Sequence, residues 1–147
     1  MTPRTHIVSR VRVVVVGLVL SVNAAIATAD VVAVVSVRSP VTTLSKNQVV
    51  DIFLGKTSRF PDGHQAAPID HVEGSAARDE FYLTLAGKSP AQVKAHWSKI
   101  IFTGRGQPPR EASSGAEVKR LVGADPNAIG YIERDLVDER VKVLLVQ

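Results

Sequence analysis

Val-Val-Ala-Val-Val-Ser-Val, residues 31–37, is the stretch that most clearly decides the fold class. Its β-branched residues favour an extended conformation, and Ala33 is its only strong helix former. Ser39-Pro40 follows directly and ends the run. We therefore expect residues 31–37 to form a buried strand.

Helix and strand signals alternate after this first strand. Three N-terminal helix signals have capping-box spacing and begin at Ser45, Ser89 and Ser114, and a further helix is expected to open at Gly74-Ser75. Short stretches predict strands at residues 69–72, 128–132 and 141–146, the last an apolar run interrupted only by Lys142 and typical of a sheet covered on both faces. This alternation, with short connections, predicts a small α/β layered domain.

The helix expected to begin at Ser89 has an apolar face. Val93, Trp97, Ile100 and Ile101 follow one another at i, i+4, i+7 and i+8. This spacing predicts that all four side chains face the core. We interpret Trp97 as a core residue rather than as a platform for a ligand.

Composition and charge exclude several function classes. The chain has 147 residues, 45% of them hydrophobic, and no cysteine, which fits one globular domain without disulfides or thiolate chemistry. The sequence pI is near 9.7, but Arg4, Arg10 and Arg12 precede residue 30 without any acid. The remainder has 15 basic and 14 acidic side chains, interspersed. Because nucleic-acid binding needs a clustered basic surface, that class is disfavoured.

Residues 1–29 have the pattern of a secretory signal peptide. A basic start precedes an apolar run at residues 13–22, and Ala27-Thr28-Ala29 fits a signal peptidase site. We expect cleavage after Ala29, which leaves residues 30–147 as a periplasmic or otherwise exported domain. The alternative is an uncleaved anchor, since the apolar run is near the lower limit for crossing a bilayer. No later segment is expected to span a membrane.

A candidate anion site lies where the second predicted helix begins. If a strand ends at Val72 and the helix begins at Ser75, the free N–H groups of Ala76, Ala77 and Arg78 point toward the loop. The Ser75 hydroxyl and the Arg78 guanidinium can add donors to a phosphate or carboxylate. The alternative is that Ser75 only caps the helix and Arg78 is a surface residue paired with an acid.

Other candidate sites carry weaker signals. The loop from Arg105 to Arg110 offers two guanidinium groups for an anion or a partner protein, but a solvated connection is the simpler interpretation. His64, Asp70 and His71 can be read as metal ligands or as ordinary solvated loop residues. Residues 74–77 do not match the G-x-S-x-G pattern of hydrolases. We therefore predict no catalytic residue, no metal and no enzyme activity.

Five short motifs occur in a fixed order along the chain. They are Leu-Ser-Lys-Asn-Gln at 44–48, Ile-Phe-Leu-Gly-Lys at 52–56, Gly74-Ser75 with Arg78 and Phe81, Phe-Thr-Gly-Arg-Gly-Gln-Pro-Pro at 102–109, and Ala-Ile-Gly-Tyr-Ile at 128–132. With these motifs the chain resembles the phosphate ABC transporter substrate-binding proteins of the PstS type, in a short exported subgroup. The resemblance covers residues 44–132.

The resemblance implies a fold and a set of site residues. It implies a small three-layer α/β lobe resembling one half of a type II periplasmic binding protein. Ser75 matches the serine of a Ser-Gly-Thr helix start that holds phosphate in the family, and Arg78 matches the basic residue that follows. Ala76 and Ala77 replace the glycine and threonine. His71 stands where the family has arginine, and a His side chain is mostly uncharged at pH 7.

The resemblance also implies a function. Full-length members enclose phosphate between two lobes, and the chain matches only one of them. The resemblance therefore implies an exported, non-enzymatic protein that binds phosphate or a similar oxyanion without a cofactor. Such a protein would serve an ABC transporter permease. The alternative is a ligand-free protein-interaction module that contacts another envelope protein, through the loop at Arg105 and Arg110.

Overall fold

The computed structural model describes residues 30–147. The predicted signal peptide and its cleavage after Ala29 lie outside these residues. The elements follow in the order β1 Val31–Ser36, β2 Thr43–Leu44, α1 Lys46–Phe53, β3 Ala67–His71, α2 Ala76–Ala86, α3 Pro90–Phe102, β4 Arg110–Ala112, α4 Gly115–Ala124, β5 Ala128–Glu133, the 3₁₀ turn η1 Arg134–Leu136, β6 Val141–Val143 and β7 Leu145–Val146. None of the described helices is long and apolar enough to cross a membrane.

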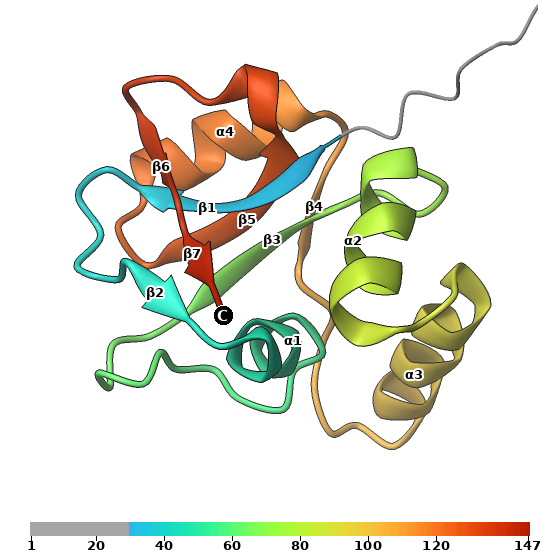
Figure 1. Cartoon of the computed structure of the whole chain (residues 1–147). Coiled ribbons are helices and arrows are strands. Elements are labelled where there is room, and N and C mark those ends of the chain that lie inside the picture. Colours follow the sequence, from blue (N-terminus) through green and yellow to red (C-terminus); the bar gives the residue numbers. More distant parts are fainter. Residues whose placement is uncertain (1–29) are drawn as a thin grey trace, which may run out of the picture.

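A five-stranded sheet in the order β4-β3-β5-β1-β6 forms the centre of the fold (Figure 1). β3 is parallel to β4 and β5, whereas β1 is antiparallel to β5 and β6. The carboxyl ends of β3, β4 and β5 and the first residue of β1 therefore lie at one edge of the sheet. Val31 at the start of β1 faces Glu133 at the end of β5.

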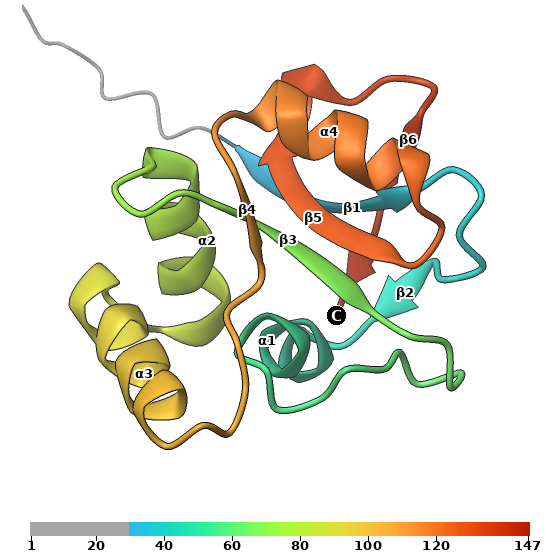
Figure 2. The same ribbon diagram turned by 180° about the vertical axis from the view of Figure 1, so that it is seen from behind.

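Helices cover both faces of the sheet. Ala33 and Val35 of β1 belong to a hydrophobic cluster with α1, α2 and α3, whereas Val32 and Val34 belong to a second cluster with α4. Figure 2, seen from behind, brings α4 to the front of the sheet. The expected buried strand is confirmed over Val31–Ser36, whereas Val37 lies outside it and is 54% exposed. The expected three-layer α/β lobe is confirmed. The residues of both clusters belong to the described part of the chain and form a hydrophobic core on each face of the sheet.

A glycine sets the close approach of α4 to the sheet. A Cβ atom at Gly130 in β5 would lie 2.6 Å from Cγ1 of Val118 and 2.9 Å from Cγ2 of Val122. Real Cβ atoms do not pack at such distances, because van der Waals repulsion is steep there. The helix thus rests directly on the backbone of β5.

The expectation of one continuous buried strand at residues 141–146 is wrong. The chain turns at Leu144, whose side chain enters the core while its N–H donates to the Ala33 carbonyl. β6 is the edge of the main sheet, and β7 leaves it to pair in parallel with β2. Val143 and Leu145 are accordingly 40% and 57% exposed. An apolar run alone does not distinguish one central strand from two short edge strands.

The expected apolar face of α3 is only partly correct. Val93 and Trp97 are buried, and Trp97 is a core residue as predicted. Ile101 is 55% exposed. Eight steps of 100° place Ile101 about 80° around the helix from Val93, which is beyond the face that packs on α2.

Candidate functional site

Two helices start at the edge where the parallel strands end. α2 begins four residues after β3, and α4 begins shortly after β4. Gly74 has a φ of +89°, a conformation that suits glycine, and it turns the chain from β3 into α2. In open α/β sheets, ligands bind outside the carboxyl ends of the strands. The predicted anion site at Ser75 therefore lies at the edge of the sheet where such folds bind ligands.

The start of α2 has donors without partners. Ser75 occupies the N-cap position, but its hydroxyl makes no capping hydrogen bond, whereas Ser45, Ser89 and Ser114 each accept one from their own helix. The backbone N–H groups of residues 76–78 have no acceptor within the described part of the chain. Three N–H groups and one hydroxyl are thus free to meet an anion.

Arg78 lies in the first turn of α2 and is held by groups of the protein. Its Nη1 donates to the His71 carbonyl oxygen at 3.0 Å and to Glu111 at 3.3 Å, and its Nε lies 3.9 Å from Oδ2 of Asp70. The guanidinium also stands over the Tyr82 ring, 5.8 Å from its centroid. Burial opposes the charge of Arg78, but the carboxylate of Asp70, aided by its other neighbours, raises the pKa of Arg78 above its usual value.

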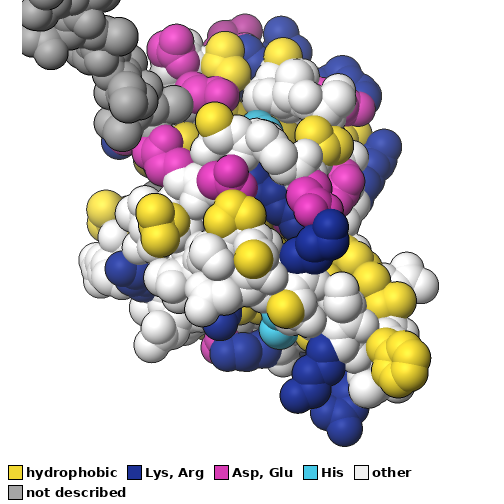
Figure 3. Space-filling model, turned by 90° about the vertical axis from the view of Figure 1, so that its right-hand side faces the viewer, with side chains coloured by type: hydrophobic (Ala, Val, Ile, Leu, Met, Phe, Trp, Pro, Cys, Tyr) yellow, Lys and Arg dark blue, Asp and Glu magenta, His cyan; other side chains and the backbone are white. Residues whose placement is uncertain are grey.

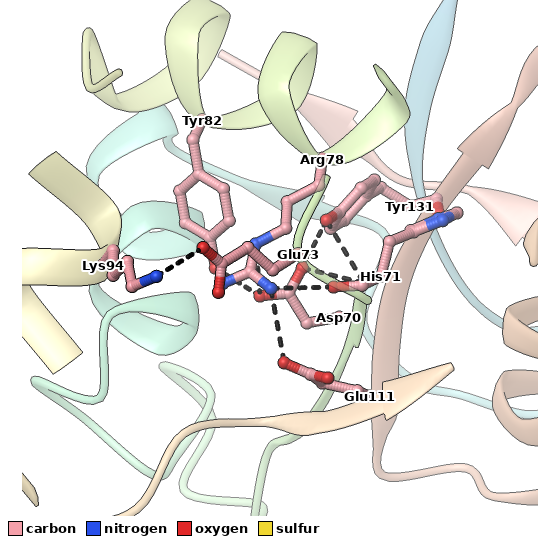
Figure 4. A network of polar contacts seen from close by, with 8 residues as sticks. All are labelled: Asp70, His71, Glu73, Arg78, Tyr82, Lys94, Glu111 and Tyr131. Carbon is pink, nitrogen blue, oxygen red and sulfur yellow. Dashed lines mark hydrogen bonds and ion pairs between the residues drawn. The ribbon is translucent and has the colours of Figure 1, made fainter. Parts of the chain in front are cut away.

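Asp70 is the centre of this network (Figure 4). Its side chain is buried and accepts hydrogen bonds from the Tyr82 hydroxyl at 2.7 Å, from the Tyr131 hydroxyl and from the His71 N–H at 2.8 Å. Burial raises the pKa of both tyrosines, and the charge of Asp70 raises it further. Both hydroxyls therefore stay protonated and act as donors to the carboxylate.

His71 does not present its ring to the candidate anion site. Its side chain is buried, stacks on the Tyr131 ring at 4.7 Å and places Nε2 2.8 Å from the Tyr131 carbonyl oxygen. Because a carbonyl only accepts, Nε2 is the protonated nitrogen. The ring points away from the Arg78 guanidinium, which contacts only the backbone oxygen of His71 (Figure 4).

The space beneath the start of α2 is small. The hollow beside Glu73, Arg78 and Tyr82 has a volume of about 10 Å³, which is close to the room for one water molecule. A larger hollow of about 480 Å³ lies between β1, α2 and β7, and another of about 450 Å³ lies beside Trp97. Neither of the larger hollows is lined by residues 75–78. An anion at Ser75 would thus remain open to solvent.

The remaining predicted site residues lie elsewhere. Arg105 belongs to the exposed turn after α3, and Arg110 is the first residue of β4. Neither is joined by a hydrogen bond or ion pair to residues 75–78 in the part of the chain that the structure describes. His64 pairs with Asp62 at 2.9 Å. Within residues 30–147, no group of three or more His, Asp or Glu side chains is arranged to hold a metal ion.

Sequence reasoning missed the network around Asp70. Tyr82 and Tyr131 are the two tyrosines of the chain, and Glu111 comes from β4. One signal was available, because a carboxylate inside a buried strand needs hydrogen-bond partners. The identity of those partners depends on contacts across 12 and 61 positions of sequence, which no local pattern reports.

The start of α4 provides a pH-dependent contact at the same edge. The Ser114 hydroxyl accepts a hydrogen bond from the Glu117 N–H, as the predicted capping box requires. The Glu117 carboxylate, however, accepts from the N–H and hydroxyl of Ser113 and not from the Ser114 N–H. The predicted capping box is therefore only half formed. These hydrogen bonds, led by the Ser113 N–H, lower the pKa of Glu117 below its usual value of 4.5. The contact therefore stabilises the fold fully above pH 4.5 and is lost as the pH falls through the lowered pKa.

We expect Glu117→Gln to make stability less sensitive to acid. The Gln side chain cannot titrate, so the variant should lose less unfolding free energy than the parent between pH 7 and about pH 3. Urea unfolding at the two pH values measures this difference. Equal losses in parent and variant would contradict the assignment. Glu139→Gln is the control, because it removes an exposed carboxylate for which the described structure shows no hydrogen bond or ion pair and leaves Glu117 and its Ser113 donors in place.

Comparison with solved structures identifies the fold. The chain is similar to a phosphate ABC transporter substrate-binding protein with bound phosphate from Clostridium perfringens, with 22% identity and a TM-score of 0.63 over 80% of this chain and 44% of that one. It is similar to an ABC-type phosphate transport receptor from Vibrio cholerae, with 21% identity and a TM-score of 0.63 over 80% and 46%.

A third solved structure gives the same result. PstS from Borrelia burgdorferi has 14% identity and a TM-score of 0.61 over 80% of this chain and 47% of that one. No family model and no curated protein sequence matches the chain. As the coverages of these three solved structures show, the chain spans less than half of the length of each of them. It has the fold of one lobe of a PstS-type substrate-binding protein, which confirms the resemblance at the level of the fold.

Proposed function

We propose that this chain, which has the fold of one PstS-type lobe, is an exported solute-binding protein that binds phosphate or a similar oxyanion at the start of α2. The observation that carries the proposal is the set of unpartnered donors there, formed by the Ser75 hydroxyl and the N–H groups of Ala76, Ala77 and Arg78. A helix N-terminus with free donors favours a negative charge. The solved structure from Clostridium perfringens has phosphate bound.

The geometry sets the expected strength of binding. Arg78 already faces the carboxylates of Asp70 and Glu111, so its charge is largely compensated before a ligand arrives. The site is also open to solvent, where charge interactions are weak. We therefore expect weak affinity from the single lobe. A second chain that covers this edge, or an ABC transporter permease, would strengthen binding by excluding water.

Thermal unfolding of residues 30–147 with phosphate, sulfate or chloride at matched ionic strength tests the proposal. Phosphate at ten times its Kd is expected to stabilise the fold by about 1.4 kcal/mol. Ser75→Asp is the decisive variant. It places a negative charge where the anion would lie, and it also suits the helix dipole. The variant is expected to fold normally and to lose the phosphate response.

A control variant at another helix start and two contradicting results complete the test. Ser114→Asp changes the corresponding position of α4 and should leave the phosphate response intact. If phosphate at millimolar concentration raises the midpoint no more than chloride does, phosphate binding by the single lobe is rejected. The same holds if Ser75→Asp retains the full response.

A further inference from the structure

One segment departs from the interspersed charges of the other described residues. Residues 88–110, which comprise α3 and the loop to β4, contain five basic residues and no acidic residue. The rest of residues 30–147 contains ten basic residues and all 14 acidic residues of the chain. In Figure 3 the Asp and Glu side chains gather mainly in the upper half of the molecule, and Lys and Arg are prominent at its lower end, where α3 ends.

The end of α3 also exposes large apolar side chains. Phe102 is 92% exposed, the highest value among the large hydrophobic residues of the described chain, and its neighbour Ile101 is 55% exposed. Every residue from 101 to 108 is exposed. Folding therefore leaves the Phe102 ring in water, and the cations Lys99 and Arg105 lie three residues before and after it in the sequence.

This end of α3, residues 99–105 and hereafter the α3 tip, is held in a defined shape. The Thr103 hydroxyl donates to the Lys99 carbonyl oxygen at 2.9 Å. Gly104 has a φ of +66°, and its N–H donates to the Ile101 carbonyl oxygen. The Arg105 N–H donates to the Ile100 carbonyl oxygen. These bonds fold Arg105 back against the last turn of the helix. Phe102 is therefore presented by an ordered turn rather than by a frayed end.

The cations of the α3 tip are free for an external partner. All 14 acidic residues lie in the described part of the chain, and none forms an ion pair with Lys99 or Arg105, whereas Lys94 one turn earlier pairs with Glu73. A projecting aromatic ring flanked by unpaired cations matches an anionic bilayer surface. The ring enters the apolar boundary while the cations meet lipid phosphates. We propose that the α3 tip docks the protein on anionic lipid membranes.

The proposal does not depend on the start of α2, so it stands or falls separately from phosphate binding. The test is co-sedimentation of residues 30–147 with vesicles of equal parts phosphatidylglycerol and phosphatidylcholine, and with pure phosphatidylcholine vesicles. We expect binding to the anionic vesicles that weakens with salt. Phe102→Ala is expected to weaken it about tenfold, and the pair Lys99→Gln with Arg105→Gln about thirtyfold.

Matched controls separate the α3 tip from the rest of the surface. Leu145→Ala removes a 57% exposed apolar side chain on β7, and Arg120→Gln removes a cation on α4. Both should bind like the parent. All changed side chains are largely exposed, and cooperative urea unfolding checks that each variant folds. Three results overturn the proposal: no binding to anionic vesicles at low salt, equal binding to pure phosphatidylcholine, or equal losses in the control variants.

Discussion

Asp70→Ala is expected to lower the free energy of unfolding by about 3–5 kcal/mol, the typical cost of breaking a buried ion pair by removing one partner. The carboxylate is 1% exposed and accepts from Tyr82, Tyr131 and the His71 N–H. Its removal leaves two buried hydroxyls without their acceptor and removes one of the two carboxylates that face Arg78. Urea unfolding at pH 7, followed by Trp97 fluorescence, measures the loss.

Two further variants sharpen this result. Asp70→Asn keeps the shape and one acceptor oxygen but removes the charge, so it should cost less than Asp70→Ala. Glu139→Ala removes an exposed carboxylate for which the described structure shows no ion pair, and it should change stability by less than about 0.5 kcal/mol. A loss below about 1 kcal/mol for Asp70→Ala would show that the network is not a stabilising unit.

Local signals in the sequence predicted the helix starts well. The capping boxes at Ser45 and Ser89 are both formed, with the predicted partners Gln48 and Gln92. A capping box is a contact within four residues, so its physics is complete in the local sequence. The same holds for the β-branched run of β1, since extended structure and burial follow from its composition.

Contacts between distant elements explain what the sequence could not predict. The break of the last strand at Leu144 depends on β1 and β2, which lie about 100 residues earlier. The orientation of the His71 ring depends on Tyr131, and the pairing of Arg78 depends on Glu111 in β4. The predicted site residues at the start of α2 are adjacent in sequence, whereas the groups that govern the charge of Arg78 are not.

The second large effect is expected from Phe81→Ala, at about 3–5 kcal/mol. The Phe81 ring is 4% exposed and stacks on Tyr131, with centroids 3.9 Å apart and planes 5° apart, and it meets Phe53 edge-on at 4.8 Å. Truncation removes both aromatic contacts and leaves a cavity between α2 and β5. Urea unfolding again measures the loss. A loss below about 1.5 kcal/mol would mean that neighbouring side chains refill the site.

Phe81 and Asp70 should also be coupled, because both contact Tyr131. The ring of Tyr131 stacks on Phe81 while its hydroxyl donates to Asp70, so once one contact is lost the other is less well positioned. A double-mutant cycle is expected to give an interaction energy of about 0.5–3 kcal/mol. Phe60→Ala is the matched control, since Phe60 is 3% exposed in the same cluster and takes part in none of the described aromatic contacts. The cycle of Phe60→Ala with Asp70→Ala is expected to give an interaction energy near zero. If the cycle of Phe81→Ala with Asp70→Ala gives the same result, the stack and the carboxylate network are independent.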